Sequence, residues 1–202
     1  MTEKKETARH GAGKVTELDR LLDELSGAVR RMRQEASHTL ATMIAEGPSS
    51  IKGEEARVAE ALIDALFRPE AQTRWEALDG LTALCGERPE LVADAYDGAE
   101  ASLFDENNAR VRVAAFRLLA RMAAKDADTS DKVWPLLDEA IQCYHGDQGY
   151  RDMLAGMLEI AEGDASAETK AALVERIKFD AESGRGYVRE KSEKIVEAAS
   201  AK

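Results

Sequence analysis

An arginine recurs along this chain at intervals of 41, 38, 39 and 38 residues, and each copy begins a segment of similar composition. The five copies are Arg33, Arg74, Arg112, Arg151 and Arg189. Seven residues after each copy stands an aliphatic side chain: Leu40, Leu81, Leu119, Leu158 and Val196. A repeat of this length with helical spacing of its apolar positions is typical of helical solenoids, whose units stack side by side. The spacing therefore predicts one continuous array.

Within each repeat, apolar residues recur every three or four positions in two runs that turn residues separate. Two helices in each of five repeats give ten helices, among them Pro89–Phe104 and Lys132–Tyr144. We therefore predict an all-α fold, a right-handed α-solenoid of about five antiparallel helix pairs, as a single domain over residues 15–202. Residues 1–14 are polar and lack an apolar core, which predicts a disordered tail without a secretion signal.

Charged side chains make up 33% of the 202 residues, and the net charge is -11. Such a charge disfavours nucleic acid and favours a protein or peptide partner. Cys85 and Cys143 lie in different repeats, and no cysteine or histidine has metal-ligand spacing, so we expect no disulfide, metal or cofactor. No stretch approaches the roughly twenty apolar residues of a membrane helix. We expect a cytoplasmic protein that does not bind membranes.

Residues 105–119, DENNARVRVAAFRLL, resemble the second-helix signature of HEAT repeats. In that signature an acidic or amide residue precedes a Val-Arg pair, and alanines and leucines follow. Asn108, Val111 and Arg112 match these positions, and residues 147–151 repeat them with an aromatic residue in place of valine. The resemblance extends over nearly the whole chain. It implies an armadillo-like helical repeat fold and says almost nothing about activity.

The repeated arginine has two interpretations. It is helically in phase with the aliphatic residue seven positions later, which predicts partial burial. A buried guanidinium needs local partners. We therefore favour a structural role in which each arginine bridges to acids and carbonyl groups of a neighbouring turn, with a row of anion-binding arginines as the alternative.

Helical phase also predicts which side chains face away from the core. In HEAT-like arrays this side of the second helices lines the concave surface, so the resemblance implies a groove there. The candidate binding residues of this groove are Trp75, Asp79, Arg110, Arg117, Arg121, Asp152 and Glu159. Because Asp79 and Arg117 hold the same position in successive repeats, we expect stacking to bring them together. Trp75 is either an interface anchor or packs on a neighbouring helix.

The helix over residues 107–125 carries five basic side chains and no acid. Either it attracts the acidic helices that flank it, or it forms a stripe that binds an acidic peptide or a phosphate. Arg110, Arg117 and Arg121 share its outward face.

The chain contains no P-loop, GxGxxG, HExxH or GxSxG motif, and we predict no catalytic residue. We predict a non-enzymatic scaffold or adaptor whose concave groove binds a protein or peptide, including one with an acidic or phosphorylated segment. As an alternative, Trp75 and Asp79, with Arg112 or Arg117, resemble the cleft of HEAT-like alkylpurine DNA glycosylases. That resemblance implies an aspartate that supports a cationic transition state. A second alternative is a structural subunit of a larger assembly.

Overall fold

The computed structural model describes residues 16–201, which form ten α-helices and no strand. The helices are α1 (Glu17–Ser26), α2 (Arg30–Glu46), α3 (Glu55–Ala65), α4 (Ala71–Glu87), α5 (Tyr96–Leu103), α6 (Ala109–Ala123), α7 (Ala127–Tyr144), α8 (Tyr150–Glu162), α9 (Ala167–Ser183) and α10 (Gly186–Ser200). Short 3-10 helices lie in the connections: η1 (Pro48–Ile51), η2 (Pro89–Leu91) and η3 (Ala93–Ala95). The predicted all-α class and the number of helices are confirmed. The predicted tail, residues 1–14, lies outside the described residues.

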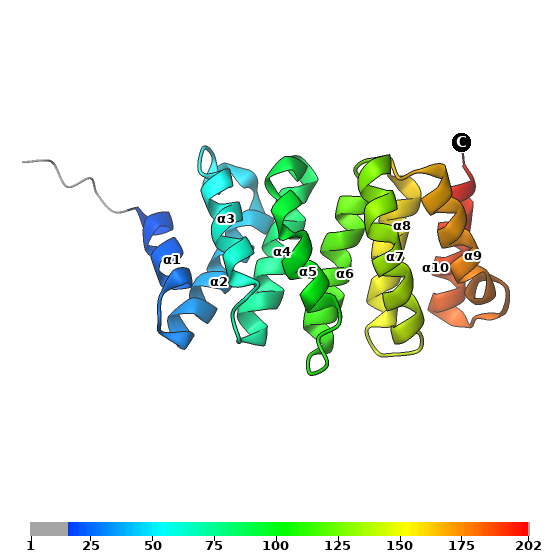
Figure 1. Ribbon diagram of the computed structural model, residues 1–202, viewed down its shortest axis with the longest axis horizontal. Coiled ribbons are helices and arrows are strands. Elements are labelled where there is room, and N and C mark those ends of the chain that lie inside the picture. Colours follow the sequence, from blue (N-terminus) through cyan, green and yellow to red (C-terminus); the bar gives the residue numbers. More distant parts are fainter. Residues whose placement is uncertain (1–15, 202) are drawn as a thin grey trace, which may run out of the picture.

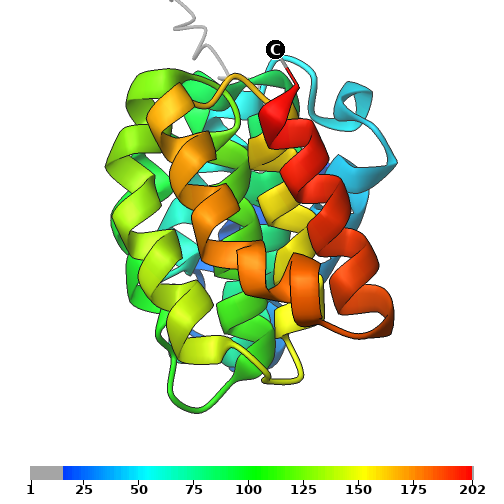
Figure 2. The ribbon, with the colours of Figure 1, turned by 90° about the vertical axis from the view of Figure 1, so that its right-hand side faces the viewer.

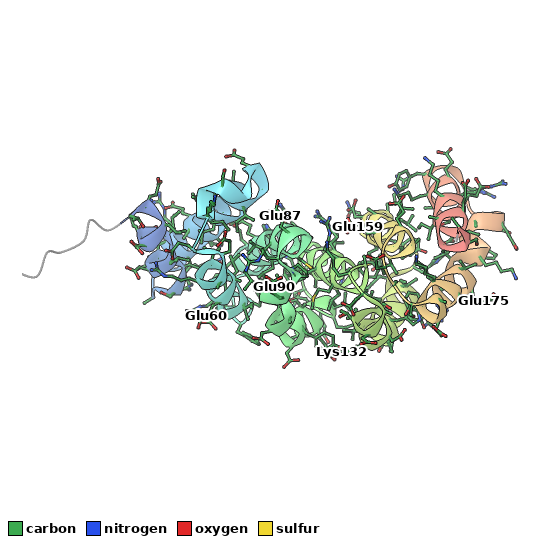
Figure 3. All side chains as sticks on the ribbon, turned by 90° about the horizontal axis from the view of Figure 1, so that it is seen from above. Glu60, Glu87, Glu90, Lys132, Glu159 and Glu175 are labelled. Carbon is green, nitrogen blue, oxygen red and sulfur yellow. The ribbon has the colours of Figure 1, made fainter. Side chains whose placement is uncertain are left out.

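The helices form two layers, because each pair folds back on itself and the pairs stack in sequence order (Figure 1). The second helices, α2, α4, α6, α8 and α10, contact one another in that order. Seen from the C-terminal end, α9 and α10 lie side by side at the end of the stack (Figure 2). The array is bowed, with Glu87 and Glu159 on the inner side and Glu60, Lys132 and Glu175 on the outer side (Figure 3). The second helices therefore line the concave surface.

The core lies between the two layers and follows the predicted register. The position three residues after each periodic arginine is fully buried in every repeat: Ala36, Ala77, Ala115, Leu154 and Ser192. Leu40, Leu81 and Leu119 are fully buried as well, whereas Leu158 and Val196 are only partly buried. Because burying a leucine side chain contributes about 1.5–3 kcal/mol, this column stabilises the first three repeats most.

The periodic arginines join neighbouring repeats. The buried Arg33 donates hydrogen bonds to the carboxylate of Glu70 in the next repeat and to the carbonyl oxygen of Gly27, the latter over 2.8 Å. Arg74 donates to the Asp105 carboxylate of the next repeat over 2.7 Å. These contacts are the local partners that a buried guanidinium needs.

The third arginine also joins neighbouring repeats, and the fifth does not. Arg112 donates to the Asp105 carbonyl oxygen over 2.8 Å, and its guanidinium lies 3.9 Å from the carboxylate of Asp147 in the next repeat. Arg189, in the last repeat, pairs with Glu193 of its own helix over 2.9 Å. The structural interpretation of the repeated arginine therefore fits Arg33, Arg74 and Arg112. The fourth arginine, Arg151, has a different environment, described below.

Two predicted helix starts are wrong. The helix expected from Pro89 begins only at Tyr96, because residues 89–95 form η2 and η3, where Val92 is fully buried. The helix expected from Lys132 begins five residues earlier, at Ala127, because the Asp126 side chain accepts a hydrogen bond from the Thr129 backbone N–H over 2.8 Å and caps it. Neither change moves the second helices that form the concave surface.

Candidate functional site: the concave groove

The concave surface contains a groove of about 670 Å³ that crosses the N-terminal parts of α6 and α8 and reaches α4 and α10. It is lined by Asp79, Ala109, Arg110, Val113, Ala114, Arg117, Gln148, Gly149, Arg151, Asp152, Ala155 and Tyr187. Three arginines and two aspartates line it, which leaves a surplus of one positive charge in a chain whose net charge is -11. The volume falls within the range of about 300–1,000 Å³ that is usual for ligand sites.

Arg110 lines the groove, whereas Trp75 lies beside it and does not line it. The guanidinium carbon of Arg110 lies 4.4 Å from the centroid of the Trp75 ring, a cation–π distance. Trp75 is partly buried, and its indole N–H has no hydrogen-bond partner among the described residues. The tryptophan therefore packs on the neighbouring repeat, and through this contact it fixes the position of an exposed arginine at the groove.

Asp79 of α4 and Arg117 of α6 form a second contact between the two helices that carry Trp75 and Arg110. Asp79 Oδ1 and Arg117 Nη1 are 3.3 Å apart, so the prediction that these positions meet is confirmed. Burial raises the pKa of the Asp79 carboxyl, and the attraction of Arg117 and Arg110 only partly offsets this effect. The charged form of Asp79 is therefore less stable here than in water, because the loss of hydration outweighs the attraction of the two arginines.

Arg121 and Glu159 lie further along α6 and α8 and do not line the groove. Arg121 donates two hydrogen bonds to the Glu159 carboxylate, over 2.7 and 2.9 Å. Arg121 is therefore already paired within the chain and lies outside the groove that Arg117 lines. Two of the basic side chains of α6, Arg117 and Arg121, pair with acids on neighbouring second helices instead of with the acidic first helices.

Asp152 lies where the sequence predicts, exposed on α8 at the groove. It stands in the first turn of its helix, where a negative side chain interacts favourably with the helix dipole. Asp152 forms no ion pair within residues 16–201. It is thus a second acid that faces the three arginines of the groove.

Arg151 and Tyr187 also line the groove, although neither is among the groove residues predicted from the sequence. The Arg151 guanidinium carbon lies 5.4 Å from the centroid of the Tyr187 ring on α10. Tyr187 is 43% exposed, which is high for a tyrosine that packs within its own chain. Arg110, a predicted groove residue, stands two residues before the periodic Arg112. Tyr187 stands two residues before the periodic Arg189, so this spacing could have predicted Tyr187 as a groove residue.

Other kinds of site find no support in the described part of the chain. Within residues 16–201, no group of three or more His, Cys, Asp or Glu side chains could hold a metal ion. Among the helices over these residues, none has the length and apolar character that would let it cross a membrane.

Known proteins resemble this chain in structure and not in sequence. No protein-family model matches the sequence, and no curated protein matches it. A designed armadillo repeat protein in complex with the peptide (KR)4 superposes with a TM-score of 0.73 at 16% identity, and the match covers 89% of this chain and 80% of the designed chain. A computationally designed armadillo repeat protein for modular peptide recognition gives a TM-score of 0.68 at 17% identity, with 88% and 80% covered.

A further engineered protein gives a TM-score of 0.67 at 18% identity, and the match covers 90% of this chain and 47% of the engineered one. At such identities the similarity establishes the fold alone. The chain has the armadillo/HEAT-like helical repeat fold, and the resemblance to that fold class is confirmed. These relatives give no support to the resemblance to alkylpurine DNA glycosylases.

Proposed function

We propose that this protein is a non-enzymatic scaffold whose concave groove binds an extended segment of another protein. The observation that supports this proposal is the groove across α6 and α8, where Arg110 and Arg151 are exposed and each stacks on an aromatic ring. Aromatic and arginine side chains dominate the binding energy of protein interfaces. Stacking also fixes the arginines before the partner arrives, which lowers the entropy cost of binding.

The charge of the groove favours a segment with acidic or phosphorylated residues. Its three arginines outnumber its two aspartates, and guanidinium groups bind carboxylate and phosphate oxygens through paired N–H donors. One structural relative, with a different sequence, holds the basic peptide (KR)4. For this chain we infer the opposite preference, because a basic peptide would meet Arg110, Arg117 and Arg151.

A library of random peptides displayed on phage tests the proposal. Binders are selected with the wild-type protein and then measured on Ala155→Tyr, in which a neutral side chain fills the groove from an exposed position of α8. We expect Ala155→Tyr to weaken binding roughly tenfold or more, the effect of losing about 1.4 kcal/mol. The matched control is Ala171→Tyr, an exposed alanine of α9 outside the groove, which should bind as the wild type does.

Circular dichroism of both tyrosine variants checks that the helices are retained. If the selected peptides bind Ala155→Tyr and wild type equally, the groove is not the binding surface. That result would favour a structural subunit that contacts its assembly through another face.

A further inference from the structure

Arg110 and Arg151 share an arrangement, although they lie on different helices. Each places its guanidinium on an aromatic ring of another repeat, 4.4 Å from Trp75 and 5.4 Å from Tyr187. Neither forms an ion pair or a side-chain hydrogen bond with any residue between 16 and 201. Stacking uses the face of the guanidinium plane and leaves the N–H groups at its edge free. The groove therefore presents two positioned sets of donors.

Arg117, the third arginine of the groove, differs because Asp79 occupies it. The Nη1–Oδ1 distance of 3.3 Å is long for a charge-assisted hydrogen bond, and the Arg117 side chain is 49% exposed. Asp79 is under the attraction of both Arg110 and Arg117, yet burial still raises the pKa of its carboxyl. The pair is thus weak by geometry and partly exposed, so a stronger anion can replace Asp79 beside Arg117.

We propose that the groove holds a subsite for one oxyanion side chain of the bound segment, a phosphate or a carboxylate, and that Asp79 is its internal competitor. The incoming anion accepts hydrogen bonds from Arg110 and displaces Asp79 from Arg117, whereas Arg151, which is turned toward Tyr187 on α10, lies outside this subsite. This inference rests on the proposed function, because it assigns chemistry to the same groove. It specifies that arginine N–H groups bind the anion and that Asp79 competes with the anion for Arg117.

An internal competitor determines selectivity as well as affinity. Arg117 increases the affinity for a ligand only if the ligand interacts with Arg117 more strongly than Asp79 does. A doubly charged phosphate, with three acceptor oxygens, meets this condition better than a carboxylate does. Asp152, the second acid of the groove, adds repulsion toward any anion. We therefore expect the affinity order phosphoserine, then glutamate, then serine.

Three synthetic peptides of the form Ala-Ala-X-Ala-Ala, with X as phosphoserine, glutamate or serine, test the inference by NMR titration of the 15N-labelled full chain. The side-chain Nε–Hε signals of Arg110 and Arg117 report the site directly, and the signal of Arg151 reports the far end of the groove. The indole signals provide an internal comparison, because Trp75 lies beneath Arg110 whereas Trp134 lies on α7, in the other layer. We expect the phosphoserine peptide to shift the signals of Arg110, Arg117 and Trp75 most, to shift that of Arg151 less, and to leave Trp134 in place.

The decisive variant is Asp79→Asn, which keeps the size of the side chain and removes its charge. We expect it to tighten phosphoserine binding up to about fivefold, the range of an exposed ion pair. Arg110→Gln should weaken binding, whereas Arg151→Gln, which changes the side chain that stacks on Tyr187, should weaken it less. Arg31→Gln removes one positive charge from the exposed face of α2, where Arg31 pairs only with Glu35 of its own helix, and should bind as wild type does.

If Asp79→Asn binds the phosphoserine peptide as wild type does, or more weakly than wild type, Asp79 is not a competitor. Equal binding of the three peptides overturns the anion subsite. Neither result affects the proposed function if library-selected peptides still fail to bind Ala155→Tyr. If no peptide shifts any groove signal in wild type or in Asp79→Asn, the subsite is absent, and the phage experiment alone decides whether the groove binds a segment.

Discussion

Asp79 and Arg117 occupy the same position in successive repeats, 38 residues apart, and their side chains form an ion pair of 3.3 Å across two neighbouring second helices. Arg121 and Glu159 form a similar pair between α6 and α8, also 38 residues apart, which is one position short of the 39-residue spacing of that repeat. The repeat length therefore decides which charges meet on the concave surface. It also explains why a helix with five basic residues does not leave all of them free for a ligand.

Leu119→Ala should destabilise the fold by about 2–5 kcal/mol, because a fully buried leucine leaves a cavity when it is shortened. Leu158 is the matched control, since it holds the same position in the next repeat and is only partly buried. Leu158→Ala should cost less. Urea denaturation followed by circular dichroism measures both variants, and equal losses would show that burial at this position does not determine stability.

Glu70→Ala should destabilise the fold by about 3–5 kcal/mol, because it leaves Arg33 buried without its counter-charge. The control is Glu54→Ala, which removes an exposed partner 3.5 Å from Arg57 and should cost about 0–1 kcal/mol.

The effect of Glu70 should also depend on pH. The hydrogen bond from Arg33 lowers the pKa of the Glu70 carboxyl below its ordinary value. Its stabilising contribution is therefore complete above the unfolded-state pKa and is lost as the pH falls through the folded-state pKa. The difference in unfolding free energy between wild type and Glu70→Ala should shrink in acid. A difference that stays constant from neutral to acidic pH would contradict the assignment.

Asp126→Ala should cost roughly 0.5–2 kcal/mol, because Asp126 caps α7 through the Thr129 backbone N–H. This hydrogen bond also lowers the pKa of Asp126, so the loss should diminish as the carboxyl of the wild type is protonated. Asp128→Ala, a change in the same first turn without a side-chain cap, is the control and should have a smaller effect. Thermal melting at neutral pH compares the two, and equal melting temperatures would contradict the capping role.

Much of the fold follows from the sequence, because a repeat makes one local pattern predict many distant contacts. The column that begins with Ala36 and Leu40 sets the register of the whole core. The start of α7 was harder to predict, because Asp126, Ser130 and Asp131 are all plausible caps and only tertiary packing selects among them. The 3-10 turns of residues 89–95 depend on the burial of Val92, which no local preference encodes.

The groove was predictable only where helical phase determines it. Phase brings Asp79 to Arg117 and places Arg110 and Asp152 on the concave side. It does not show that Arg121 already has a carboxylate partner, because that depends on the length and direction of two side chains. The role of Arg151 was hidden as well, since it stacks on Tyr187 instead of pairing with an acid as the earlier arginines do.

The contacts of the Asp79 carboxylate favour the scaffold interpretation over the enzymatic one. In the glycosylase resemblance, the aspartate faces a cationic sugar, so its carboxylate must be free to stabilise positive charge. In this structure the Asp79 carboxylate already contacts Arg117 and is attracted by Arg110, two cations that would repel such a transition state. The net charge of -11 further opposes approach to DNA.

We therefore expect no release of a methylated base from duplex DNA by wild-type protein, measured by strand cleavage at the resulting abasic sites. Asp79→Asn should give the same background, while its affinity for the phosphoserine peptide rises. At low salt the wild type should pass through a heparin column without retention, because an acidic surface releases few counterions from a polyanion. Base release that wild type shows and Asp79→Asn lacks would establish catalysis instead, and Asp79 would then be a catalytic residue and not a competitor for the ligand.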